Sequence, residues 1–150
     1  MKTLAFVLMT AIICFGCKKS EITESPLTSP GMMAKISGTS IDYGSPFAEK
    51  QMSTDGTETI FISASATNGN SIEISLSKQG GISGGVYGVS NGAFIGISDG
   101  TNYFATGNTV SIKIISMDAT HVVGSFSGSA QDGSSSSTKS ITEGRFYANF

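Results

Sequence analysis

The clearest pattern in this chain is an alternation of apolar and polar residues with a period of two. Residues 57–67 and 71–77 place isoleucine, leucine or alanine at every second position, mostly with serine, threonine or glutamate between them. Such alternation is typical of strands that bury one face. Asn68-Gly69-Asn70 separates the two segments, and these residue types accept the positive φ of a tight hairpin turn. We therefore predict an antiparallel pair, with a buried face formed by Ile60, Ile62, Ala64, Ala66, Ile72, Ile74 and Leu76.

The alternation continues through most of the chain beyond residue 31. The other predicted strands are 32–37, 86–90, 93–98, 102–105, 110–114, 121–130 and 141–150. Turn signals such as NG, DG and GG recur at short intervals, and no window has a helical apolar stripe. We therefore predict an all-β fold, a single antiparallel domain of about eight strands. Its architecture is a sandwich or a flattened up-and-down barrel.

Two segments interrupt the predicted strands. Residues 131–140, QDGSSSSTKS, are polar and of low complexity, and we interpret them as a hairpin tip between the last two strands. The glycine-rich run 80–88 lacks both G-x-G-x-x-G and a Walker lysine, which argues against phosphate binding. We expect its glycines to allow a turn, a bulge or a close strand crossing.

The N-terminal segment has a different character. Leu4–Phe15 is an apolar run of twelve residues, whereas a membrane-spanning helix needs about 20. Its length fits the apolar region of a secretory signal. The following Gly16-Cys17 resembles the lipobox of bacterial lipoproteins. Cys14 is a poorer candidate for lipidation, because Ile13 would occupy a position that requires a small residue.

The lipobox resemblance implies cleavage after Gly16 and a diacylglyceryl thioether on Cys17, with palmitate-type acyl chains that bind the membrane. Each buried CH₂ contributes about 0.8 kcal/mol, so two or three chains anchor the protein firmly. We therefore divide the chain into a signal peptide (1–16), a lipidated cysteine with a flexible polar tether (17–30) and a β domain (31–150). The alternative is a soluble secreted protein with a free Cys17.

Charge and cysteine content narrow the classes of function. The chain has a net charge of −2 and no basic stripe, which argues against nucleic-acid binding. Its two cysteines are Cys14 and Cys17. With Cys14 removed and Cys17 lipidated, the domain would contain no disulfide and no thiolate metal site.

A weak catalytic motif occurs in the glycine-rich run. Gly81-Ile82-Ser83-Gly84-Gly85 matches G-x-S-x-G, and Asp99 or Asp118 and then His121 follow in the order used by α/β-hydrolases. A nucleophile elbow requires a helix after the serine, whereas residues 86–90 have the pattern of a strand. We therefore predict no catalytic residues and keep a serine hydrolase as an alternative.

Metal and cofactor signals are also weak. His121 is the single histidine, and with Asp118 or Glu143 it does not give metal-ligand spacing. Asp99-Gly100-Thr101-Asn102 has the pattern of a turn rather than of a calcium loop. We predict no metal and no cofactor.

Five aromatic residues admit two interpretations. Phe61, Tyr87, Phe94, Tyr103 and Tyr147 could form a platform for sugars or a protein-binding groove. We instead expect them in the core or at its edges, because a chain without tryptophan must fill its core with phenylalanine, isoleucine and valine.

The β region resembles a family of small Bacteroidota-type lipoprotein domains of unknown function. The resemblance covers residues 31–150 through the segments MMAKISGTSI, GGVYGVS, VSIKIISMDATHVVGSFSGSAQD and ITEGRFYANF. The matching positions are Ala34, Ile36, Gly38, Thr39, Tyr87, Asp118, Gly124, Phe126, Ser127, Ile141, Thr142, Gly144 and Phe146. The resemblance implies a β fold and a location in the cell envelope, and it implies nothing about catalysis because the family has no assigned activity.

These observations favour a lipid-anchored envelope protein that acts as a non-catalytic binding or interaction module. Its partner would be another envelope protein, a glycan or a small hydrophobic ligand. The alternatives are a hydrolase that uses Ser83 and His121, or a purely structural lipoprotein. Lys18 follows the cysteine in place of the aspartate that retains lipoproteins in the inner membrane, so the resemblance favours the outer membrane and leaves open which side the domain faces.

Overall fold

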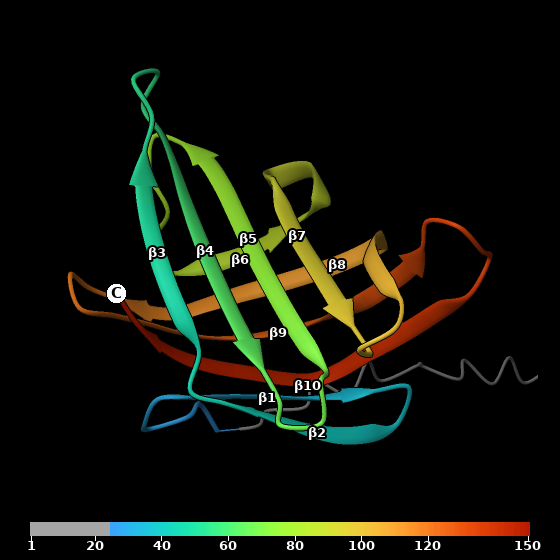
Figure 1. Cartoon of the computed structure of the whole chain (residues 1–150). Helices are drawn as coiled ribbons and strands as arrows, with labels where there is room; N and C mark the ends of the chain where they lie inside the picture. Colours follow the sequence, from blue (N-terminus) through green and yellow to red (C-terminus); the bar gives the residue numbers. More distant parts are fainter. Residues whose placement is uncertain (1–24) are drawn as a thin grey trace, which may run out of the picture.

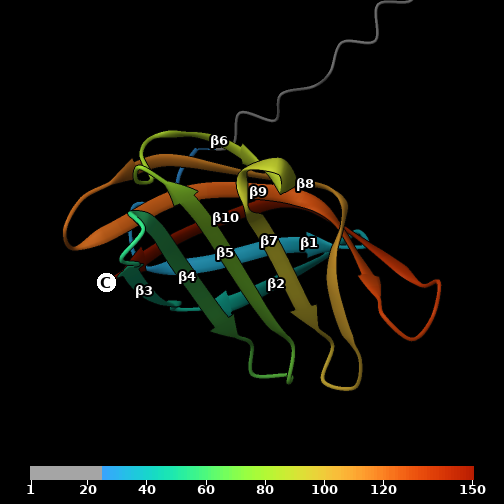
Figure 2. The same ribbon diagram turned by 90° about the horizontal axis from the view of Figure 1, so that it is seen from above.

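Two layers of strands pack against each other in a sandwich-like single domain. The computed structural model describes residues 25–150. In Figures 1 and 2, β3, β4, β5 and β7 run side by side, and β8, β9 and β10 cross behind them at a steep angle. We call β3, β4, β5 and β7 the front layer. The back layer consists of β2, β1, β10, β9, β8 and β6 in spatial order.

The strands have the following bounds. The front layer contains β3 (Phe47–Met52), β4 (Thr57–Ser65), β5 (Ser71–Gln79) and β7 (Ala93–Ser98). The back layer contains β1 (Gly31–Ile36), β2 (Thr39–Gly44), β6 (Gly85–Gly88), β8 (Tyr103–Met117), β9 (His121–Asp132) and β10 (Thr138–Asn149). A short 3₁₀ turn, Val89–Asn91, follows β6.

The two layers are joined at both sides. The start of β8 pairs with β7 through Ile97 and Phe104, and the end of β10 pairs with β3 through Asn149 and Phe47. The β10–β3 pairing is parallel, and the other pairings among residues 25–150 are antiparallel. The sheet is therefore mixed and continuous around the core.

The all-β prediction is confirmed, but the prediction of an antiparallel domain of about eight strands is matched only roughly, because the sheet described here is mixed and has ten strands. The sequence pattern missed β2 and β3, each of which buries a single side chain, Tyr43 and Ala48 respectively. Strands with so few inward apolar residues leave little alternation to detect. The predicted strands 102–105 and 110–114 are both part of β8, whose pairing with β9 shifts register between Thr106 and Val110.

The predicted inward faces form the core. In the β4–β5 pair, Ile60, Ile62, Ile72 and Ile74 are each 2% exposed, and Gly69 has the expected positive φ of 85° in the turn. In the back layer, the core includes Val110, Ile112, Ile114, Val122, Phe126, Ala130, Phe146 and Ala148. These inward faces make burial of apolar surface the main stabilising contribution.

Glycine allows two phenylalanines to pack between β9 and β10. Gly144 lies opposite Phe126, and Gly124 lies opposite Phe146. A Cβ on Gly144 would stand 2.5 Å from the Phe126 ring. The two rings stack with their centroids 6.2 Å apart. Each glycine therefore provides the space that the ring on the paired strand occupies.

The loops largely match their predictions. The tip between β9 and β10 spans residues 133–137, shorter than the predicted 131–140 because both strands extend into that segment. Its Asp132 carboxylate accepts hydrogen bonds from Ser134 and Ser135. Gly80 and Gly81 take positive φ values of 80° and 97° in the turn after β5, as their predicted role requires.

The chain enters the domain on the outer face of the back layer. Arg145 on β10 donates a hydrogen bond to the carbonyl oxygen of Ser25 (3.3 Å) and another to the sulfur of Met33 on β1 (3.0 Å). Arg145 points outward, since its neighbours Gly144 and Phe146 are buried. Among residues 25–150, no helix has the length and apolar character to cross a membrane.

Candidate functional site

The outer face of the front layer carries two phenylalanines in one cross-strand row. Phe61 on β4 pairs with Ser75 on β5, which pairs with Phe94 on β7. Alternation turns these three side chains outward, because the residues beside them on each strand are buried. Phe61 is 45% exposed. The two rings therefore stand on either side of a serine on the surface of the sheet.

The adjacent row contributes an acid and a tyrosine. Ser63, Glu73 and Gly96 pair across the same three strands, and the Tyr103 hydroxyl donates a hydrogen bond to the Glu73 carboxylate. A Cβ on Gly96 would collide with both the Tyr103 hydroxyl and the Glu73 side chain. Burial, followed by the Glu73 hydrogen bond and charge, raises the pKa of Tyr103 to about 12. Tyr103 is therefore a neutral donor that fixes the position of Glu73.

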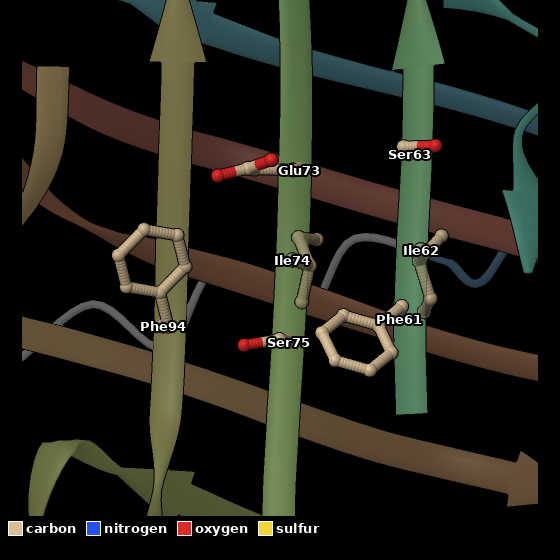
Figure 3. A pocket seen from close by; sticks show the side chains of 7 residues that line it. All are labelled: Phe61, Ile62, Ser63, Glu73, Ile74, Ser75 and Phe94. Carbon is tan, nitrogen blue, oxygen red and sulfur yellow. The ribbon is translucent and has the colours of Figure 1, made fainter. Parts of the chain in front are cut away.

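Together these rows form an open hollow of about 270 Å³. Figure 3 shows Phe61 and Phe94 on opposite sides of Ser75, with Glu73 farther along the same strand and Ser63 on β4. Ile62 and Ile74 complete the lining. We call this hollow the Phe61–Phe94 groove.

The outward positions of the front layer include no lysine or arginine. The two lysines in these strands have the opposite alternation. Lys50 lies 3.5 Å from the buried Glu58 carboxylate, and Lys78 lies over the Tyr87 ring, 5.5 Å from its centroid. The outward acids are Glu49 and Glu73. The face consequently suits neutral or cationic ligands better than anions.

The prediction that the five aromatics lie in the core or at its edges is wrong for the residues of this face. Tyr87 is buried as expected, at 5% exposed, whereas Tyr103 is 49% exposed. Tyr147 lies on the back layer, where its ring stacks on His121 with a centroid distance of 5.2 Å. The sequence contains a signal for the groove, because Phe61 and Phe94 occupy positions that alternation assigns to the outward face.

The hydrolase motif does not assemble. The loop that carries Ser83 is held from inside the domain, where the Glu58 carboxylate accepts the Ile82 N–H (2.5 Å) and the Tyr87 hydroxyl donates to the Ser83 carbonyl (2.7 Å). Strand β6 follows it, so the strand–turn–helix context of a nucleophile elbow is missing. Among residues 25–150, no hydrogen bond joins the Ser83 side chain to His121.

Of the acids considered with His121, Asp118 contacts its ring, whereas Glu143 and Asp99 have other partners. Asp118 lies 3.1 Å from the His121 ring. Hydrogen bonds from Thr120, and then from His121, hold the pKa of Asp118 below its usual range. Glu143 instead binds Lys35 at 2.6 Å. Asp99 accepts the N–H groups of Thr101 and Asn102, as expected for a turn. No group of three metal-ligating side chains occurs within residues 25–150.

Cys17 and the cleavage site after Gly16 lie outside the described residues. Comparison of the chain with family models, with curated proteins and with solved structures gives no match.

Proposed function

We propose that this protein is a lipid-anchored, non-catalytic binding module of the cell envelope, and that its Phe61–Phe94 groove binds a neutral saccharide chain. The observation that carries the proposal is the pair of outward rings on β4 and β7 with Ser75 between them. Folding alone does not require these rings, because the inward positions of the same strands already supply the core.

The chemistry of the groove matches that of a sugar. A pyranose ring has an apolar C–H face that packs against an aromatic ring, and hydroxyls that both donate and accept hydrogen bonds. Phe61 and Phe94 supply the two ring faces. Ser63 and Ser75 supply hydroxyls, and the Glu73 carboxylate accepts strong hydrogen bonds from sugar hydroxyls.

The spacing and charge of the groove narrow the ligand further. Neighbouring strands lie about 4.7–4.9 Å apart, so the Cα atoms of Phe61 and Phe94 are separated by roughly twice that distance. This span suits consecutive units of an oligosaccharide better than a single sugar. Acidic saccharides would meet Glu73 and Glu49 with no compensating lysine or arginine on the face.

The position of the tether is compatible with display of the groove. Ser25 is held by Arg145 on the outer face of the back layer, which is the side of the domain opposite the groove. Residues 18–24 would link Ser25 to a lipid on Cys17, with a reach of at most about 3.6 Å per residue. An anchor at Cys17 would therefore join the domain on the side opposite the groove.

The direct test is an array of neutral and acidic oligosaccharides probed with the protein isolated from membranes. We expect binding to neutral chains, and we expect Phe61→Ala and Phe94→Ala each to weaken it at least tenfold, which corresponds to about 1.4 kcal/mol. Val86→Ala is the matched control, because Val86 is a 65% exposed apolar residue on the back layer. Wild-type affinity in both phenylalanine variants, or binding to acidic chains alone, would overturn the proposal.

The anchor requires its own test. Intact-mass analysis of the membrane-extracted protein should give a chain that begins at Cys17 and carries acyl chains. An unmodified chain recovered from the medium would contradict the anchor and would leave saccharide binding to be judged on the array.

A further inference from the structure

A second cavity lies where the β1–β2 hairpin meets the end of β7 and the start of β10, and it shares no lining residue with the Phe61–Phe94 groove. Its volume is about 200 Å³. Three isoleucines, Ile36, Ile41 and Ile97, form apolar walls, and Tyr43 lines it with them. We call it the Tyr43 pocket.

The Tyr43 hydroxyl is a donor that makes no hydrogen bond within the described part of the chain. The side chain is 2% exposed, and its hydroxyl has no hydrogen-bond partner among residues 25–150. The small exposed part of the side chain opens into the pocket that Tyr43 lines. Burial raises the pKa of this phenol to about 12, so it remains a neutral donor at physiological pH. The hydroxyl is not among the fully enclosed unpaired side-chain atoms of residues 25–150, so water reaches it, and a ligand oxygen would take the place of that water.

The charges at the pocket are already compensated. Lys139 on β10 lies 2.5 Å from the Asp99 carboxylate, and its ammonium lies over the Phe104 ring, 4.2 Å from the centroid. Asp99 also accepts two backbone N–H groups. A charged ligand would have to break this ion pair or face the like charge within it. The pocket therefore favours an uncharged ligand.

We propose that the Tyr43 pocket binds a small uncharged molecule with an apolar body and one acceptor oxygen, such as a ketone, an ester or a lactone. The apolar body packs against Ile36, Ile41 and Ile97, and the oxygen accepts the Tyr43 hydroxyl. The pocket is smaller than the cavities that hold drug-sized ligands, which limits the ligand to a single ring or a short chain.

Cyclohexanone and methylenecyclohexane test this proposal, because they share a shape and only the ketone carries an acceptor oxygen. Binding would be followed by the changes in the NMR chemical shifts of Ile41 and Ile97. The protein for this experiment would comprise residues 17–150 and carry the substitution Cys17→Ser. We expect cyclohexanone to bind at least tenfold more tightly than the hydrocarbon. In Tyr43→Phe the two probes should bind equally, whereas Tyr103→Phe should preserve the difference.

The proposal would be overturned if neither probe shifts the NMR signals of these isoleucines, because the pocket would then hold only water. It would also be overturned if the two probes bind the wild type with equal affinity. A lower melting temperature in Tyr43→Phe would overturn it too, because the hydroxyl would then already have a partner. Retained cyclohexanone binding in Phe61→Ala would show that this pocket is independent of the saccharide groove.

Discussion

The two outer faces of the sandwich use their outward positions in different ways. The front layer presents Phe61 and Phe94, with Tyr103 of the adjoining start of β8 beside them, and its outward positions include no lysine or arginine. The back layer pairs Lys35 with Glu143 and holds the entering chain through Arg145. Both layers bury a regular inward face of isoleucine, valine and phenylalanine. The difference is therefore confined to positions that the core does not constrain.

This contrast separates what folds the chain from what it displays. A strand needs its inward residues to be apolar, whereas its outward residues are free to be polar. The back layer uses this freedom for ion pairs and hydrogen bonds within the molecule. The front layer instead exposes aromatic side chains. Their contact with water is unfavourable, and exposed apolar groups of this kind are typical of interaction surfaces.

The largest expected effect on stability comes from replacing a phenylalanine of the core with alanine, compared with the same replacement of an outward phenylalanine. Phe146→Ala should destabilise the protein by about 3–5 kcal/mol, because this ring is fully buried and its loss leaves a cavity. Phe61→Ala should change the stability by about 0.5 kcal/mol or less, as surface substitutions do. Denaturant unfolding of both variants measures the difference. Equal losses would mean that Phe61 belongs to the core, and the contrast would fail.

A smaller loss is expected where glycine makes space for a ring. Gly144→Ala places a Cβ 2.5 Å from the Phe126 ring, and we expect overpacking to cost about 1–3 kcal/mol. Gly133→Ala is the control, because a Cβ there meets nothing within 4 Å. The midpoints of urea unfolding give both values. A neutral Gly144→Ala would show that the two strands are less tightly packed than the back layer requires.

The sequence predicted the inward faces well because burial imposes a periodicity on them. Ile60, Ile74 and Phe146 were all assigned correctly from alternation alone. Tyr43 and Ala48 were missed, because a strand with one buried residue has no period. The groove was missed for a different reason. Alternation placed Phe61 outward, but only the strand order brings it into register with Ser75 and Phe94.

The candidate sites depend on pairings between residues distant in sequence. Glu73 and Tyr103 meet only because β7 lies between their strands and Gly96 leaves room for both. Lys139 and Asp99 meet only because the end of β7 and the start of β10 lie together. These contacts cannot be predicted from the composition of the chain or from the spacing of its residues. The order of Ser83, Asp118 and His121 along the chain matches that of hydrolases, yet order could not show that the Ser83 side chain makes no hydrogen bond to His121.

The Lys139–Asp99 pair connects the two layers and predicts a pH dependence. Lys139, followed by the Asn102 and Thr101 N–H groups, holds the pKa of Asp99 well below its usual range. A lowered folded pKa stabilises the protein above the unfolded value, about 3.9, and this contribution is lost as the pH falls toward the folded value. Lys139→Met should therefore lower the melting temperature at neutral pH, with a deficit that narrows below about pH 4.

Lys113→Met controls for the loss of a positive charge, since Lys113 is an exposed lysine of the back layer with no ion pair to another residue of the described part of the chain. Its effect on the melting temperature should not narrow in the same acid range. A Lys139→Met deficit that stays constant down to low pH would mean that the lysine acts through its contact with Phe104 alone.

The smallest effect concerns the fixed geometry of the front face. The pKa of Tyr103 is raised to about 12 by burial first and by the Glu73 hydrogen bond and charge second. Glu73→Gln removes the second cause, so the pKa should fall toward 10 without reaching it. Phenolate absorbance in a Tyr43→Phe background would follow the titration, because that background removes the other tyrosine raised to about 12. An unchanged midpoint would mean that Tyr103 does not bind Glu73 in solution, and the groove would lose the contact that fixes its carboxylate. A fall all the way to 10 would mean that burial contributes nothing, and Tyr103 would then stand free of the sheet instead of packing over Gly96.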